Sequence, residues 1–159
     1  MGMVTIGISD LNIATPPNIL VTYALGSCIG ICLHDKAHNI GGLAHIMLPS
    51  SKEATKASDN LRRYADTGIE ELVNLLKSKG VLVSSLTAKI AGGAQMFQTN
   101  CSTFNIGARN ITAVKQVLAK YRIPIIAEDT GLNFGRTVFF DVATGVMQVK
   151  SVNQGVVNL

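Results

Sequence analysis

The stretch from Ile19 to Leu48 constrains the fold more than any other part of the chain, because it is long, apolar and interrupted mainly by small residues. Short apolar segments rich in β-branched residues are typical of strands. The stretch contains three such segments: 19–25, 29–34 and 43–48. The tetrapeptide 35–38, with sequence DKAH, separates the last two and predicts the turn of an antiparallel hairpin.

A turn at this tetrapeptide fixes which residues lie opposite each other. It pairs His34 with Asn39 and, further along, Cys28 with His45. Directly opposed residues carry Cβ atoms about 4.5–5.5 Å apart on one face of the sheet, which brings a thiol within reach of an imidazole. An imidazole accepts the thiol proton and thiolate is the reactive form, so the pair predicts a nucleophilic cysteine. A slip of one residue would place the two side chains on opposite faces.

The residues around Cys28 fit this chemistry. Gly26 and Ser27 precede it, and a bend at small residues exposes a side chain and lets backbone N–H groups converge as an oxyanion hole. A nucleophile–base pair also needs a third group that orients the imidazole. Thr22, on the preceding predicted strand, is the candidate for His45. Threonine is ordinary in strands, so the spacing alone leaves this choice open.

The other thiols and imidazoles point to simpler roles. Cys32 lies inside an apolar run and is expected to be buried, and Cys101 lies among polar residues and is expected to be a loop thiol. His34 and His38 flank the turn and are expected to face solvent. For His45 a purely structural role is the alternative to catalysis, since a strand histidine is more often structural than catalytic. A metal site is a further alternative, but its ligands lack the spacing of zinc modules: Cys28, Cys32, His34, His38 and His45.

Two later segments have the period of amphipathic helices. The first begins near Leu61, with Asp59 or Asn60 as its cap, and ends before Gly80. The second spans about 108–121. Their apolar stripes predict core faces made of Ile69, Leu72, Val73 and Leu76 in the first helix, and Ile111, Val114, Val117, Leu118 and Tyr121 in the second.

Further strand patterns surround these helices, at 86–91, 123–128, 137–142 and 146–150. The early hairpin, the strand–helix–strand alternation and a late hairpin together indicate a mixed α/β or α+β sheet domain. The sequence contains neither an interdomain linker nor an internal repeat, and its length suits one domain, so we expect a single domain over residues 1–159.

Composition excludes several classes of protein. Hydrophobic residues make up 47% of the chain and the net charge is only +4, which excludes a disordered chain. Three cysteines are too few for a disulfide scaffold. The chain lacks an apolar run of membrane-spanning length, and its first residues lack the basic region of a signal peptide, so a cytoplasmic protein without membrane insertion is expected.

The basic residues are spread along the sequence rather than clustered, and aromatic residues do not interleave with them. Nucleic-acid binding needs a basic face, and single-strand binding needs stacking platforms. We therefore expect no nucleic-acid partner, and we expect no cofactor.

Motifs across most of the chain, roughly residues 4–150, resemble the CheD family of bacterial and archaeal chemoreceptor glutamine deamidases. The matching blocks are Leu25–Cys28, Ala44–Pro49, Lys56, Tyr64–Asp66, Ala88–Ala94, Met96–Phe97, Asn105–Asn110 and Ala127–Gly131. The sequence departs from the family pattern at Gln95 and in the loop 50–60, which affects the expected substrate preference more than the chemistry.

The resemblance implies a catalytic triad of Cys28, His45 and Thr22, with backbone donors near Gly26 and Ser27 at the oxyanion. The cysteine and the histidine are the same two residues that the hairpin spacing favours. The resemblance also implies a mixed β-sandwich or layered sheet with flanking helices, similar to cysteine-dependent toxin deamidases.

The activity implied by the resemblance is hydrolysis of receptor glutamine side chains to glutamate through a thioester on Cys28. The implied protein partners are methyl-accepting chemotaxis receptors and CheC, a phosphatase of the response regulator CheY, which regulates the family's deamidases. Three alternatives stay open: a receptor- and CheC-binding adaptor that stimulates the phosphatase, a receptor methylesterase that uses the same thiol, and a transglutaminase-like or general thiol esterase.

Overall fold

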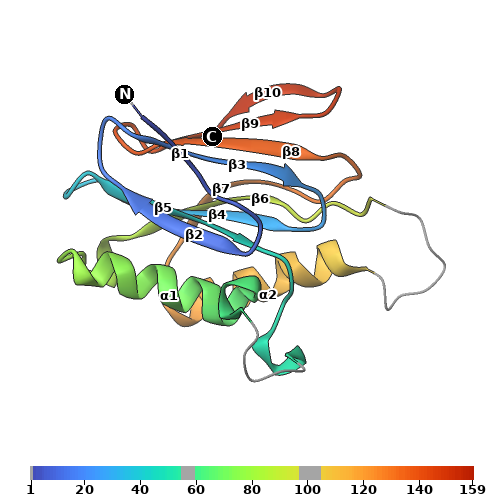
Figure 1. Cartoon of the computed structure of the whole chain (residues 1–159), viewed down its shortest axis with the longest axis horizontal. Coiled ribbons are helices and arrows are strands. Elements are labelled where there is room, and N and C mark those ends of the chain that lie inside the picture. The colour runs from blue at the N-terminus through green and yellow to red at the C-terminus, as the bar shows by residue number, and fades with distance from the viewer. Residues whose placement is uncertain (1, 55–59, 97–104) are drawn as a thin grey trace.

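The computed structural model describes residues 2–54, 60–96 and 105–159, which form two β-sheets and a layer of two helices (Figure 1). The helices are α1 (Ala65–Ser78) and α2 (Ile106–Lys120). The strands are β1 (Met3–Thr5), β2 (Asp10–Ala14), β3 (Ile19–Leu25), β4 (Ile29–Asp35), β5 (Ile40–Ile46), β6 (Thr87–Gly92), β7 (Ile125–Thr130), β8 (Arg136–Asp141), β9 (Val146–Ser151) and β10 (Gly155–Asn158). Three short 3-10 turns lie at Ser51–Glu53, Leu61–Arg63 and Val83–Ser85.

Each sheet of the described residues has five strands and one parallel pair. The outer sheet has the order β1-β3-β8-β9-β10, and the central sheet has the order β2-β5-β4-β6-β7. Strands β1 and β3 run parallel, as do β6 and β7, and the other pairs are antiparallel. The central sheet lies between the outer sheet and the helices (Figure 1).

The central hairpin β4–β5 is buried on both faces, and this explains why its sequence is apolar almost throughout. Every residue of β5 is buried, and so is every residue of β4 except His34. An outer strand such as β8 instead alternates buried and half-buried residues. A strand covered on both sides needs apolar side chains at successive positions, whereas a strand covered on one side needs them at alternate positions.

Two glycines let both neighbouring layers approach this hairpin closely. A Cβ atom on Gly42 would lie 2.6 Å from Leu72 Cδ1 of α1, and one on Gly41 would lie 2.9 Å from Phe140 Cε2 of the outer sheet. Both separations are far below an ordinary carbon–carbon contact of about 3.5–4.0 Å. The glycines therefore set the spacing of the three layers around β5.

Two apolar clusters fill the spaces between the layers. The cluster between the central sheet and the helices contains Ile31 and Ile46 from the hairpin and Leu72 and Leu118 from the helices. The cluster between the two sheets contains Leu20, Cys32, Leu43 and Phe140, with Cys28 packed at its edge. The two faces of β4 and β5 thus belong to two different cores.

The helices follow the predicted stripes closely. All four predicted positions of α1 are buried, and Gly80 ends the helix with φ +87° while the Val81 N–H donates to the Leu76 carbonyl. The helix begins later than predicted, because Asn60 caps the 3-10 turn before it rather than α1 itself. In α2 the buried stripe includes Asn110, a polar position that the apolar pattern did not predict.

The predicted fold class is confirmed as a mixed α+β protein with two sheets and flanking helices. All seven predicted strands are present, but β1, β2 and β10 are additional strands that the sequence did not predict. They lie at sheet edges and have only three to five residues, which is too short for a strand pattern to mark them. Within the described residues, no helix is long and apolar enough to cross a membrane. Asp59 and Cys101 lie outside the described residues.

The packing predicts unequal effects for the same substitution at two leucines near the helical layer. Leu72 is fully buried between α1 and β5, whereas Leu82 is 67% exposed. Leu72→Ala should lower the free energy of unfolding by about 2–5 kcal/mol, and Leu82→Ala should change it by less than about 0.5 kcal/mol. Urea unfolding measures both values. Similar losses for the two variants would contradict this layer arrangement.

Candidate active site

The central hairpin has a different register from the predicted one. In the structure Asp35 pairs with Ile40, and Gly30 rather than Cys28 lies opposite His45. The predicted pairing of Cys28 with His45 is therefore wrong by two residues. Because side chains alternate with a period of two, this error keeps every side chain on its predicted face.

The side chain of Asp35 explains the shift. Asp35 is buried at the end of β4, where its carboxylate accepts hydrogen bonds from the Ala37 N–H at 3.0 Å and from His38 Nδ1 at 2.6 Å. These bonds hold the carboxyl pKa of Asp35 below its ordinary value against the opposing effect of burial. They also keep Asp35 in the strand, so the turn moves to residues 36–39, where Asn39 adopts φ +54°.

Cys28 and His45 consequently have a diagonal relation on one face of the hairpin. His45 follows Leu43 by two positions on β5, and both side chains face the space between the sheets, the same space that Cys28 borders. Gly30 lies opposite His45 and offers no side chain there. A Cβ atom at Gly30 would contact Leu25 Cδ1 at 3.1 Å and Thr22 Cγ2 at 3.7 Å. The glycine thus leaves the room in which residues of both sheets meet.

Thr22 crosses from the outer sheet to the histidine. Its Oγ1 lies 2.7 Å from His45 Nδ1 and 2.8 Å from the Ile6 carbonyl oxygen, and both side chains are fully buried. A carbonyl can only accept, so the single hydroxyl proton of Thr22 goes to Ile6. The hydroxyl must then accept from the ring, which places the ring proton on Nδ1. The structure thereby fixes the tautomer of His45.

The other ring nitrogen of His45, Nε2, carries a lone pair in this tautomer. Nε2 is buried and has no hydrogen-bond partner within the described residues. Burial lowers the pKa of His45 from its ordinary value of 6.5 to about 4, so the ring is neutral at pH 7. A neutral imidazole with an unused lone pair is a proton acceptor, and it faces the side of the hairpin on which Cys28 lies.

Cys28 lies half-buried in the turn 26–28 between β3 and β4. Burial raises the pKa of its thiol, and the cysteine's own backbone N–H opposes this increase in part. The resting protein therefore holds a neutral thiol and a neutral imidazole, with no hydrogen bond between the two among the described residues. Reaction of this thiol requires that a base remove its proton during the attack.

The backbone of the cysteine turn is held at three successive carbonyls. The Gly26 oxygen accepts from the Ala94 N–H and the Cys28 oxygen from the Gly93 N–H, each at 2.9 Å. The Ser27 oxygen accepts from the side-chain amide of Asn110, also at 2.9 Å. In contrast, the N–H groups of Ser27 and Cys28 donate to no carbonyl of the described residues. These are the backbone donors that an oxyanion near the thiol can use.

Glycines make this support possible. A Cβ atom on Gly92, where φ is +112°, would lie 2.2 Å from the Cys28 oxygen, and one on Gly107 would lie 2.4 Å from the Ala94 oxygen. Hence the loop after β6 fits between the cysteine turn and α2 only without side chains at these positions. Sequence reasoning did not predict this support or the role of Asn110, although a polar residue within the apolar stripe of α2 was a visible signal.

The other described cysteine and the other two histidines have different surroundings from Cys28 and His45. Cys32 is buried as predicted. His38 is exposed on the turn beside Asp35, but His34 is half-buried rather than solvated, since its Nε2 lies 2.8 Å from the Val142 oxygen and its ring packs edge-on against Phe140. Within the described residues, no group of three or more histidine, cysteine or acidic side chains is arranged to hold a metal ion.

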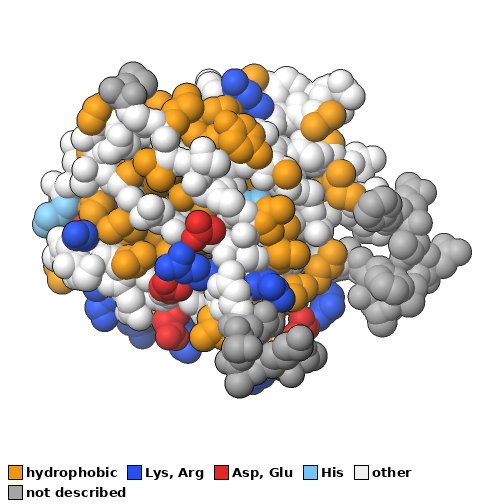
Figure 2. Space-filling model, viewed as in Figure 1, with side chains coloured by type: hydrophobic (Ala, Val, Ile, Leu, Met, Phe, Trp, Pro, Cys, Tyr) orange, Lys and Arg blue, Asp and Glu red, His pale blue; other side chains and the backbone are white. Residues whose placement is uncertain are grey.

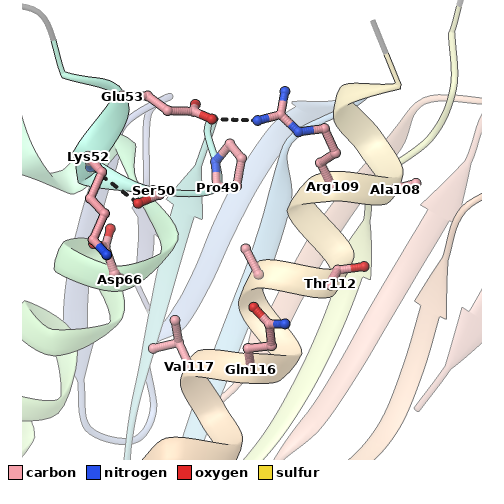
Figure 3. A pocket seen from close by; sticks show the side chains of 11 residues that line it. Pro49, Ser50, Lys52, Glu53, Asp66, Ala108, Arg109, Thr112, Gln116 and Val117 are labelled. Carbon is pink, nitrogen blue, oxygen red and sulfur yellow. Dashed lines mark hydrogen bonds and ion pairs between the residues drawn. The ribbon is translucent and has the colours of Figure 1, made fainter. Parts of the chain in front are cut away.

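A pocket of about 600 Å³ lies on the helical side of the molecule, between the segment 49–53 and the helices α1 and α2 (Figure 3). Arg109 reaches across its mouth to form an ion pair with Glu53, and the Ser51 hydroxyl donates to Asp66 at 2.6 Å. None of the three candidate site residues, Thr22, Cys28 and His45, lines this pocket.

Charged side chains also gather over the helical layer rather than over the outer sheet (Figure 2).

Comparison with known proteins agrees with the fold and gives the family. Residues 47–151 match the family model described as CheD chemotactic sensory transduction. A protein of Lachnoclostridium phytofermentans named "Probable chemoreceptor glutamine deamidase CheD" is 46% identical over 154 residues, which cover 96% of this chain and 95% of that protein. The "Chemoreceptor glutamine deamidase CheD" of Halalkalibacterium halodurans is 44% identical over 155 residues and 96% of each chain.

Among solved structures, a Neisseria meningitidis protein of family DUF152 has a similar fold, with a TM-score of 0.52 and 9% sequence identity. The match covers 83% of this chain and 64% of the Neisseria chain. Fold and site together describe a layered α+β protein that presents a cysteine turn at one end of its central hairpin. The chain belongs to the CheD family.

The low pKa of His45 predicts that this residue contributes to the loss of folding stability in acid. Between pH 6.5 and pH 4 the unfolded chain binds a proton at His45 and the folded chain does not, so stability falls as the pH decreases through this range. His45→Asn keeps a donor for the Thr22 hydroxyl but cannot titrate. Urea unfolding at pH 7 and pH 4.5 should show that the wild type loses about 2–3 kcal/mol more than the variant. Equal losses would contradict a buried neutral His45.

The raised pKa of Cys28 predicts how the thiol reacts in the free protein. The rate of alkylation by iodoacetamide should rise with pH through an apparent pKa above about 8.5, the value of an ordinary cysteine. The rate measured for Cys28→Ala is subtracted to remove the contribution of other thiols. A rate that is already at its plateau at neutral pH would instead indicate a resting thiolate–imidazolium pair.

Proposed function

We propose that this chain is a chemoreceptor glutamine deamidase, which hydrolyses glutamine side chains of a receptor to glutamate with Cys28 as the nucleophile. Membership of the CheD family and the names of relatives at 43–47% identity support the activity. The observation that carries the assignment to this site is the Thr22–His45 hydrogen bond, because it leaves Nε2 of a neutral ring available as a base.

The first half of the reaction forms a thioester. Nε2 of His45 takes the thiol proton as the sulfur of Cys28 attacks the carboxamide carbon, and the carbonyl electron pair moves to the oxygen. The N–H groups of Ser27 and Cys28 stabilise this oxyanion. When the tetrahedral intermediate collapses, the carbon–nitrogen bond breaks. The leaving nitrogen receives the proton from His45, so ammonia departs and the acyl group remains on the sulfur.

The second half of the reaction releases glutamate. His45, neutral again, removes a proton from a water molecule that attacks the thioester carbon, and the carbon–sulfur bond breaks as the thiol is regenerated. Thr22 does not exchange protons with the substrate. It holds the ring so that Nδ1 stays protonated and Nε2 is the atom that accepts and returns the proton in both halves.

The surroundings of the thiol suit a protein substrate. The Met96 side chain is 46% exposed and lies against Gly26, where a Cβ atom would be 3.2 Å from Met96 Cγ. Leu132, which is 66% exposed, accepts a hydrogen bond from the Gln95 N–H in the same loop region. Exposed apolar side chains beside a reactive group favour docking of a macromolecular surface.

The product explains how the reaction would alter a receptor. Each glutamine that becomes a glutamate adds one negative charge, and charge-changing modifications shift packing in helical bundles. The net charge of +4 suits an acidic protein substrate. We further propose that CheC binds this chain and regulates the deamidation, and that both act in the cytoplasm; family membership supports these two statements.

The proposal predicts loss of deamidation when the sulfur of Cys28 is removed. Incubation with a receptor cytoplasmic fragment should release ammonia and add negative charge to the receptor. Cys28→Ala should release none above background, because the other described cysteine, Cys32, is fully buried and out of reach of a receptor side chain. Cys32→Ala, a matched change at a buried cysteine of the same strand region, should retain activity. A coupled enzymatic assay measures the released ammonia, and mass spectrometry of the receptor measures the conversion of glutamine to glutamate.

Two results would contradict this proposal in different ways. A wild-type protein that releases no ammonia from the receptor would contradict the deamidase activity itself. Equal release by the wild type and by Cys28→Ala would leave the activity but remove Cys28 as its nucleophile.

A further inference from the structure

A buried amide in α2 lies against the end of the central hairpin. Asn110 is fully buried and continues the apolar stripe of α2 that includes Val114 and Leu118. Its Nδ2 donates to the Ser27 oxygen and to the Met47 oxygen, both at 2.9 Å. Both partners are acceptors, so both hydrogens of the amide are engaged.

The two carbonyls flank the residues of the candidate site. Ser27 immediately precedes Cys28, and Met47 follows the strand that carries His45. The last ladder pair of the hairpin is Ile29 with Ile46, so the amide bridges β4 and β5 just past the point where their own backbone bonds end. The β3–β4 connection and the first turns of α2 accordingly lie at the same end of the molecule (Figure 1).

The bond to Ser27 determines the direction of the next N–H group. The Ser27 oxygen and the Cys28 nitrogen belong to one planar trans peptide, in which C=O and N–H point in opposite directions. Asn110 draws the oxygen towards α2, on the helical side of the central sheet. The Cys28 N–H therefore points to the opposite side, towards the space between the sheets that His45 faces.

We propose that Asn110 is a positioning residue of this site, which aims the Cys28 N–H at the oxyanion formed when the thiol attacks a carbonyl. The inference deepens the proposed function, because it names the residue that prepares the oxyanion donor. Asn110 touches neither the thiol nor the substrate and acts only through the Ser27–Cys28 peptide. Its second bond, to Met47, keeps the end of β5 at a fixed distance from the same peptide.

Asn110 stabilises the fold less than a leucine would at this position, which indicates that the amide has a specific role. Asn110 Oδ1 is buried without a hydrogen-bond partner among the described residues, and a buried unpaired polar atom destabilises a protein. Asparagine is also a weaker helix former than leucine, which has a similar volume. A leucine would continue the stripe towards Val114 without either penalty. A leucine, however, could not donate the hydrogen bonds to the Ser27 and Met47 oxygens.

Two reagents separate positioning of the N–H from general damage to the site. p-Nitrophenyl acetate acylates a thiolate: the carbon–sulfur bond forms, an oxyanion develops, the carbon–oxygen bond breaks and nitrophenolate leaves. Iodoacetamide alkylates the same thiolate by displacement of iodide and forms no oxyanion. Because both reactions require the same thiol to lose its proton at the same pH, the ratio of their rates removes any change in thiol pKa or exposure.

The experiment compares this ratio for the wild type, Asn110→Leu and Asn110→Ala, with Cys28→Ala as the blank. Leucine keeps the volume of the side chain, and alanine serves if leucine disturbs folding. Asn74→Leu, the same change at an exposed position of α1, is the matched control. The ratio of acylation to alkylation should fall by about tenfold or more in both Asn110 variants, since one oxyanion donor is worth about 10²–10³ in rate. The control should keep the wild-type ratio.

An unchanged ratio in the folded Asn110 variants would overturn the inference, even if both absolute rates fell together. That outcome would assign Asn110 a structural role only. The test does not depend on receptor chemistry. If the wild type releases no ammonia from the receptor, the proposed function fails, while the ratio still decides the role of Asn110.

Discussion

The hydrogen bonds of one buried hydroxyl hold the arrangement at the site together. Thr22 belongs to the outer sheet and His45 to the central sheet, and their contact at 2.7 Å requires that the two sheets pack at a fixed distance. Because the Thr22 proton is already used by Ile6, the direction of the contact has only one solution. The packing of the two sheets thereby determines which ring nitrogen of His45 carries the proton. Any change that separated the sheets near Gly30 would release the ring and its tautomer together.

Burial acts on the two reacting groups in the same direction. It lowers the pKa of His45 and raises that of Cys28, so each change favours the neutral form. A separated thiolate and imidazolium would lose more hydration energy here than on the surface. The neutral pair has a mechanistic consequence, because the proton must move while the sulfur bonds to carbon. In the proposed reaction an oxyanion forms as the proton moves, which is why the direction of the Cys28 N–H matters.

The sequence predicted the common face of Cys28 and His45 better than the register of the hairpin. The apolar hairpin, the choice of Cys28 and His45 and the common face follow from strand alternation, which survives a register error of two residues. The register itself depends on Asp35, whose buried carboxylate is satisfied by the turn it helps to form, and no local pattern predicts that. Thr22 was proposed from its place on the neighbouring strand, but its contact with His45 depends on the packing of two sheets. Asn110 was missed because the helix pattern considered only apolar residues.

Glycine explains how the backbone after β6 packs so closely against the cysteine turn. At Gly92 and Gly107 a Cβ atom would lie 2.2 and 2.4 Å from a backbone oxygen, and at Gly93 it would lie 2.4 Å from the Ile111 side chain, so backbone without side chains fills the space between the cysteine turn and α2. Backbone atoms are a better support than side chains for this purpose, because they have no rotamers to lose when a substrate binds. The Gly26 and Cys28 oxygens each accept a backbone hydrogen bond from this loop, and the Ser27 oxygen accepts one from Asn110. If the proposed reaction takes place here, such a turn offers its donors to the oxyanion before any substrate arrives, without reorganisation of the backbone during the reaction.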